Sequence, residues 1–125
     1  MVAILWVGVG GFLGSVLRYL LGGWVHRGLN SPWFPYGTLV VNMTGCLLIG
    51  LLAGLTESHQ VINPEGRLFL FIGLLGGFTT FSTFAYETST FLEDGQIVAA
   101  SLNVGVQVIF GLVSVWLGGL ISRIL

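Results

Sequence analysis

The strongest constraint on this chain is the presence of four long apolar stretches separated by short polar segments. They cover roughly residues 2–25, 35–55, 67–91 and 96–122, each near the ~20 residues that a helix needs to cross a bilayer. The runs are continuous and lack the alternation of a membrane β-barrel strand. Charged residues make up 7% of the chain, compared with about 25% in soluble domains. The sequence therefore predicts an all-α integral membrane protein, with residues 1–125 forming one domain of four transmembrane helices.

The arginines are divided almost evenly between the two sides that four spans would create. With both termini on one side, Arg67 and Arg123 lie on that side, whereas Arg18 and Arg27 lie near the other. Membrane orientation follows the Lys/Arg bias between short loops, and this chain has almost no such bias. The pattern predicts insertion in both orientations, and hence a dual-topology, antiparallel homodimer.

Composition also argues against several classes of function. The chain has no lysine and a net charge of −1, so it lacks the basic surface of a nucleic-acid-binding protein. Cys46 is the only cysteine, which leaves neither a disulfide framework nor a thiolate metal site. His26 and His59 are isolated, and the spans hold no Ser/His or paired-carboxylate constellation. We therefore do not expect an enzyme.

The third stretch contains, near its middle, a segment that weakens a helix. Gly76 and Gly77 stand side by side, and four residues with hydroxyls follow within five positions, namely Thr79, Thr80, Ser82 and Thr83. Paired glycines and β-branched residues are poor helix formers, so the sequence predicts a broken third helix. Channels and transporters use such breaks to bind ions. The alternative is an unbroken glycine-rich helix contact, with the hydroxyls bonded back to carbonyls.

Polar side chains within the spans are candidates for an ion pathway because they are costly in lipid. Asn42 lies several residues into the second stretch, and its amide could serve either an ion or a hydrogen bond between helices. Asn103 and Gln107 are four residues apart, so they share one face of the fourth helix with Ser114. This stripe of three polar residues favours a pore-lining role over exposure to lipid.

Two aromatic and two charged residues complete the candidate set. Phe81 and Phe84 share a helix face within the hydroxyl cluster, where the positive edge of each ring could meet a small anion. Packing or lipid contact is the alternative for both rings. Arg18 could attract anions in a vestibule or extend to the membrane interface. Glu87 could reach the interface, bond a neighbouring helix or tune ion access.

Three motifs carry a resemblance to a known family. They are GGFLGSVLRY at 10–19, GTLVVNMTG at 37–45 and GGFTTFSTF at 76–84. With the four-span layout, they cover essentially the whole chain and resemble the Fluc/CrcB-type fluoride channels. The resemblance implies a fluoride-selective channel that exports fluoride passively across the bacterial inner membrane. It also implies a multi-pass antiparallel homodimer, surrounded by membrane lipid, with two pores.

The same resemblance implies roles for individual residues. Each pore would be lined by Asn42, Phe81 and Phe84, together with hydroxyls of Thr80, Ser82 and Thr83. A structural Na⁺ on the twofold axis of the dimer would be held by the backbone carbonyls of Gly76 and Thr79. Arg18 and Glu87 match charged positions of the family. Some members carry Tyr and Ser where this chain has Asn103 and Gln107, so the polar track of the fourth helix departs from the pattern.

Two other functions fit a chain of this size and layout. A small dual-topology multidrug/proton exporter also has four spans, but it needs an acidic residue in its first helix, and residues 2–25 contain no Asp or Glu. A non-transporting membrane assembly subunit would explain the 20 glycines as packing residues. It would not explain hydroxyls crowded beside two phenylalanines at a helix break.

Overall fold

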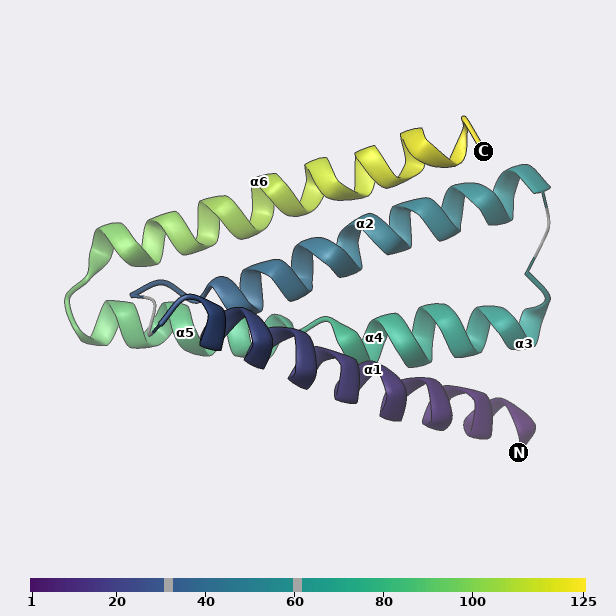
Figure 1. The fold of residues 1–125 in the computed structure, drawn as a ribbon, viewed down its shortest axis with the longest axis horizontal. Coiled ribbons are helices and arrows are strands. Elements are labelled where there is room, and N and C mark those ends of the chain that lie inside the picture. Colours follow the sequence, from purple (N-terminus) through teal and green to yellow (C-terminus); the bar gives the residue numbers. More distant parts are fainter. Residues whose placement is uncertain (31–32, 60–61) are drawn as a thin grey trace.

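Four membrane-spanning helices make up the fold, as the sequence predicts. The computed structural model describes residues 1–30, 33–59 and 62–125. Within these ranges four helices are long and apolar enough to cross a membrane. Three of them are α1 (Val2–Gly28), α2 (Tyr36–His59) and α6 (Ile97–Ser122), and the third span in chain order runs over Pro64–Glu93 (Figure 1). The predicted all-α membrane fold is thereby confirmed.

The third span is interrupted, also as predicted, but its glycines do not form the interruption. It consists of α3 (Pro64–Arg67), the π-helical segment η1 (Leu68–Leu75), α4 (Gly76–Phe78) and α5 (Phe81–Glu93). Between α4 and α5, Thr79 and Thr80 have extended backbones, with φ/ψ of −81°/159° and −148°/108°. Gly76 and Gly77 are helical. The predicted break is confirmed, and of the poor helix formers that indicated it, only the β-branched threonines adopt the extended conformation.

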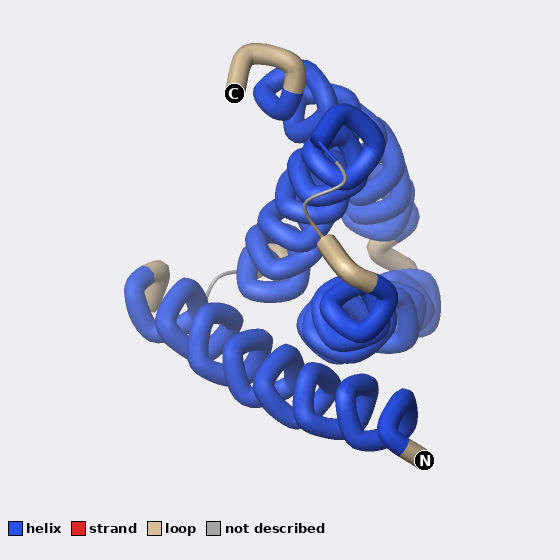
Figure 2. The backbone as a smooth tube through the Cα atoms, turned by 90° about the vertical axis from the view of Figure 1, so that its right-hand side faces the viewer, coloured by secondary structure: helices blue, strands red, loops and turns tan. Residues whose placement is uncertain are grey.

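The largest contacts between spans fall in two pairs. α1 lies mainly against η1 and α4 of the third span, and α2 lies mainly against α6, while smaller contacts join α1 to α2 and α5 to α6 (Figures 1 and 2). Glycines make both contacts close. A Cβ on Gly14 would lie 2.1 Å from the Leu74 carbonyl oxygen, and one on Gly118 would lie 2.2 Å from that of Leu47. Backbones therefore touch directly, as small residues at GxxxG-like spacing allow in lipid.

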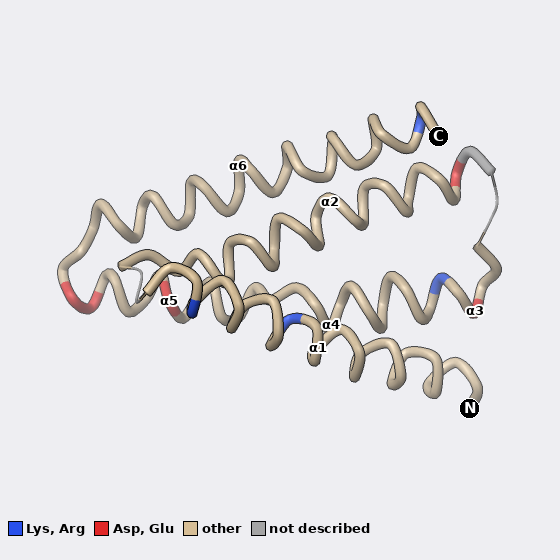
Figure 3. The backbone as a smooth tube through the Cα atoms, viewed as in Figure 1, with Lys and Arg blue, Asp and Glu red and all other residues tan. Residues whose placement is uncertain are grey.

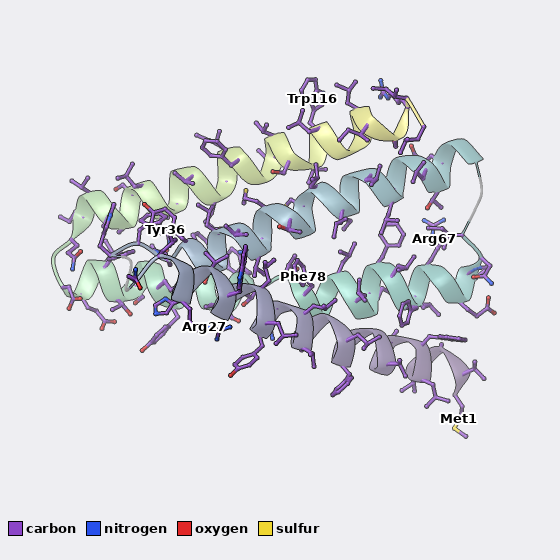
Figure 4. The ribbon with its side chains drawn as sticks, viewed as in Figure 1. Met1, Arg27, Tyr36, Arg67, Phe78 and Trp116 are labelled. Carbon is purple, nitrogen blue, oxygen red and sulfur yellow. The ribbon has the colours of Figure 1, made fainter. Side chains whose placement is uncertain are left out.

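The outer surface is largely apolar, and most charges avoid the middle of the molecule; Arg18, which reaches the break in the third span, is the exception. Acidic and basic residues lie mostly toward the two ends of the helices (Figure 3). Trp116 points away from the other spans and is 65% exposed, whereas Phe78 lies inside the fold and is 6% exposed (Figure 4). Large exposed apolar side chains, with few charges between the helix ends, are what a chain surrounded by hydrocarbon requires.

Candidate ion-binding site at the broken helix

The broken backbone is completed by one side chain from another span. Asn42, in α2, donates its Nδ2 to the Thr80 carbonyl oxygen at 3.1 Å, and its Oδ1 accepts from the Thr80 N–H at 2.9 Å. The amide therefore takes both backbone groups of the extended residue. An unpaired backbone group in hydrocarbon costs several kcal/mol, so this pairing is what lets the break exist inside a membrane.

A glycine brings α2 close enough for this pairing. Gly45 lies one turn after Asn42, and a Cβ there would lie 2.2 Å from the Thr79 Cγ2 atom. Any larger residue at position 45 would force the Thr79 side chain or α2 itself to move. The same span thus contributes both the polar side chain and the close approach that its hydrogen bonds need.

Thr80 also caps the helix that follows. Its Oγ1 accepts from the Thr83 N–H at 3.1 Å and donates to the Thr83 Oγ1 at 2.8 Å, an arrangement typical of a threonine N-cap. The first N–H groups of α5 consequently lie at the break. Because a helix N-terminus carries a partial positive charge, this end of the 13-residue helix favours anions.

A pocket of about 370 Å³ opens beside the break, and we call it the aromatic pocket. Its lining includes seven of the residues singled out in the sequence, namely Asn42, Gly76, Thr79, Thr80, Phe81, Phe84 and Gln107. The rings of Phe81 and Phe84 meet edge to face with centroids 5.4 Å apart. Amides, hydroxyls and aromatic rings therefore converge on one cavity, and they do so from α2, the third span and α6.

A second pocket, which we call the arginine pocket, lies against α1 and has a volume of about 390 Å³. Arg18, Thr38 and Thr83 line it, and Thr80 lines both pockets. Arg18 donates its Nη1 to the Thr79 carbonyl oxygen at 3.3 Å, which places its positive charge at the break. Further along, the Thr38 hydroxyl donates to Glu87 Oε1 at 2.5 Å.

The remaining predicted residues do not line the aromatic pocket. Asn103 is fully buried and donates its Nδ2 to Thr88 Oγ1 at 3.0 Å. Ser82 is exposed, with its Oγ 3.4 Å from Thr80 Oγ1. Thr88 was not predicted as a site residue. Its spacing could have indicated it, because a hydroxyl four residues after Phe84 lies one helical turn further along α5. In the structure this hydroxyl donates to the Phe84 carbonyl oxygen at 2.8 Å. The pore roles of these residues stay predictions.

The carbonyls at the break have the chemistry that the expected Na⁺ needs. In a continuous helix the Gly76 carbonyl would accept from the Thr80 N–H, which here bonds Asn42 instead. Gly76 is also exposed on the surface of the single chain. Hard cations favour oxygen ligands, so the donor type fits. The Thr79 carbonyl is shared with Arg18, and a bound cation would have to compete with that guanidinium.

Comparison with known proteins assigns the chain to a family. A family model described as "CrcB-like protein, Camphor Resistance (CrcB)" matches residues 5–119, which include every residue of both pockets. The chain is 49% identical to the Fluoride-specific ion channel FluC of Geobacter sulfurreducens, with 98% of each chain covered. It is 45% identical to that of Geotalea uraniireducens over the full length of both chains. It is 43% identical to that of Acidobacterium capsulatum, over 95% of this chain and 94% of the relative.

Proposed function

The chain belongs to the CrcB-like family, and from that premise we propose that it is a fluoride-specific ion channel. It is a multi-pass membrane protein of a family of channels, not an enzyme. We place it in the bacterial inner membrane, where it lets fluoride leave the cytoplasm passively. The observation that carries the proposal is the aromatic pocket at the helix break, where amides, hydroxyls and aromatic rings meet the positive end of α5.

The chemistry of this pocket suits an anion that is small and strongly hydrated. A pore for such an ion must replace its water with other donors, yet must not bind it so tightly that it cannot leave. Hydroxyls and amides donate without a full charge, and ring edges add a weak positive potential. Thr80, Phe81 and Phe84 are the residues we assign to the pathway here, with Ser82 and Thr83 at the start of α5 and Asn42 and Gln107 opposite.

The arginine pocket supplies the approach to this pathway. Arg18 gives it a fixed positive charge, which raises the local concentration of anions. Glu87 accepts a hydrogen bond from Thr38, which lines the same pocket, and a carboxylate there lowers the positive potential that Arg18 creates. Thr80 separates this approach from the aromatic pocket, since it lines both.

We further propose that two copies assemble as an antiparallel homodimer with two pores. The even division of arginines supports both orientations, and the exposure of Gly76 and of Phe81, which is 78% exposed, leaves the break of one chain open to a second copy. Gly76 and Thr79 of both copies would hold a central Na⁺ through their carbonyls. When bound, the ion supplies a fixed positive charge that favours anions nearby.

Ion efflux from liposomes tests the proposed function. Purified protein should release fluoride, measured with a fluoride electrode, far faster than protein-free liposomes do. Chloride release should stay near the protein-free rate. Equal release of both anions would contradict the proposed selectivity, and no fluoride release would contradict channel function. Drug uptake driven by a proton gradient would instead identify the exporter.

A further inference from the structure

Both amide hydrogens of Asn42 are already engaged within the chain. One lies on the Thr80 carbonyl oxygen at 3.1 Å and the other on Gln107 Oε1 at 3.2 Å. The Asn42 oxygen accepts from the Thr80 N–H. The side chain expected to donate to the ion therefore has no spare donor while Gln107 keeps this orientation.

The hydrogen bonds decide which way both amides face. A backbone N–H can only donate, so the Asn42 atom that faces the Thr80 N–H must be its oxygen. Asn42 Nδ2 then faces Gln107, whose nearest atom must also be an oxygen. The Gln107 Nε2 group is left buried and without a partner among the described residues, in a side chain that is only 8% exposed. A buried donor without a partner is costly, so this orientation is poised to change.

A half-turn of one bond reverses the arrangement. The terminal torsion of glutamine is broad and roughly twofold, so exchanging Oε1 and Nε2 meets little torsional resistance. With no ligand present, the exchange would set two N–H groups against each other. With an anion in the aromatic pocket, which Asn42 and Gln107 both line, the two N–H groups can converge on that anion.

We propose that Asn42 and Gln107 form a two-amide clamp for fluoride in which Gln107 is the moving member. Its oxygen takes the free Asn42 N–H when the anion is absent, and its nitrogen joins Asn42 on the anion when it is present. Asn42 stays fixed by its two bonds to Thr80. The inference rests on the proposed function, because it assumes that fluoride passes through the aromatic pocket.

Asn103 shows why the clamp belongs to Gln107 although both lie on one face of α6. The Thr88 hydroxyl donates its hydrogen to the Phe84 carbonyl oxygen, so in its bond with Asn103 it can only accept, and Asn103 must donate. The Asn103 atom without a partner among the described residues is consequently its oxygen, which repels an anion. Of these two buried amides, only Gln107 has a donor to offer.

Flux measurements on matched variants test the clamp. Gln107→Met keeps the length of the side chain and removes both polar atoms, so fluoride efflux should fall about tenfold or more. Ile109→Met, on the exposed side of α6, is the control and should stay within about twofold of the unmodified protein. If the clamp acts as a unit, the Asn42→Ala/Gln107→Met double variant should conduct no worse than Asn42→Ala alone. Flux in Gln107→Met equal to or above that of the unmodified protein, or losses that multiply, would overturn the clamp.

An NMR measurement of fluoride binding to the unmodified protein tests the clamp even if a variant does not fold. The chain contains three glutamines, so ¹⁵N-glutamine labelling of the whole protein gives few side-chain amide signals. The Gln107 signal, assigned with Gln107→Glu or by selective labelling, should shift on addition of fluoride and stay in place on addition of chloride. An unmodified protein that conducts fluoride without such a shift refutes the clamp. One that conducts no fluoride refutes the proposed function instead.

Discussion

Asn42 and Thr80, residues from different spans, hydrogen-bond each other twice, at 3.1 Å and 2.9 Å. One side chain thus gives two backbone groups the partners that a continuous helix would have given them. A break that would be intolerable in hydrocarbon is made stable by a residue 38 positions away. The conformation of the third span therefore depends on its contact with α2.

Replacing Asn42 should destabilise the protein as well as reduce conduction. Asn42→Leu leaves the Thr80 N–H and carbonyl without their partners, which should lower the free energy of unfolding by about 1–3 kcal/mol per group. Chemical unfolding in detergent, followed by circular dichroism, measures the change. Thr56→Val is the control, because that hydroxyl bonds only one turn back along α2, to Leu52. An unchanged midpoint for Asn42→Leu would contradict the role we give to this side chain.

Phe81 and Phe84 provide a test of the ring edges. Phe81→Ile and Phe84→Ile keep the site apolar, so stability should change by under about 3 kcal/mol, yet each should sharply reduce fluoride efflux. The control is Phe12→Ile, at a ring of α1 that is 69% exposed and lines neither pocket. Near-normal efflux from both variants would show that the rings serve packing alone.

The contact between α1 and the third span can be probed with a single methyl group. In Gly14→Ala the new Cβ would lie 2.1 Å from the backbone oxygen of Leu74, so the helices must separate, at a cost of about 1–3 kcal/mol. Gly8→Ala is the matched control, because nothing lies within 4 Å of its added Cβ. That variant should be stabilised by up to about 1 kcal/mol through helix propensity. Equal unfolding midpoints would rule out close backbone packing.

Dual topology predicts that one loop position is reachable from both sides of the membrane. Asp94, which lies between α5 and α6, is exposed, and Asp94→Cys in a Cys46→Ala background gives a single reactive thiol. An impermeant maleimide should label part of the protein from outside sealed vesicles and the rest only after they are opened. Adding lysines beside position 94 should bias the protein to one orientation. Complete labelling from one side, without added lysines, would exclude dual topology.

A structural Na⁺ predicts that fluoride flux needs the ion without carrying it. Exchange of Na⁺ for a large organic cation during purification should abolish efflux, and returning Na⁺ should restore it. The reversal potential should follow the fluoride gradient alone, because a carbonyl-bound ion on the symmetry axis does not move. Full flux in protein freed of Na⁺, or a reversal potential that follows Na⁺, would contradict the proposal.

Features set by length and composition could be predicted from the sequence. Four apolar stretches predict four spans, and the 20 glycines predict close helix contacts, such as the one between Gly73 and Gly10, where a Cβ added to Gly73 would lie 2.9 Å from the Gly10 Cα. A break in the third span also followed from helix propensity. These features depend on residues that are close together in the sequence, so they can be predicted without knowing how the helices pack.

The exact residues of the break and the partners of the polar residues could not be predicted this way. Propensity indicates a weak segment that contains both Gly76 and Gly77 and the threonines after them, and the structure limits the break to Thr79 and Thr80, where Asn42 bonds the backbone. Spacing alone likewise treats Asn103 and Gln107 as equivalent. Their partners come from different spans, and only the packed structure separates a buried structural amide from one that faces the pocket.

Thr80 belongs to both pockets, so its substitution cannot separate the approach of the ion from its binding. This residue lines both the arginine pocket and the aromatic pocket, so a substitution there should change the approach of the ion and its binding together. Thr83 lines the first pocket and Phe84 the second. Substitutions at Thr83 and Phe84 should therefore affect the approach of the anion and its binding separately. A substitution at Thr80 should affect both steps at once.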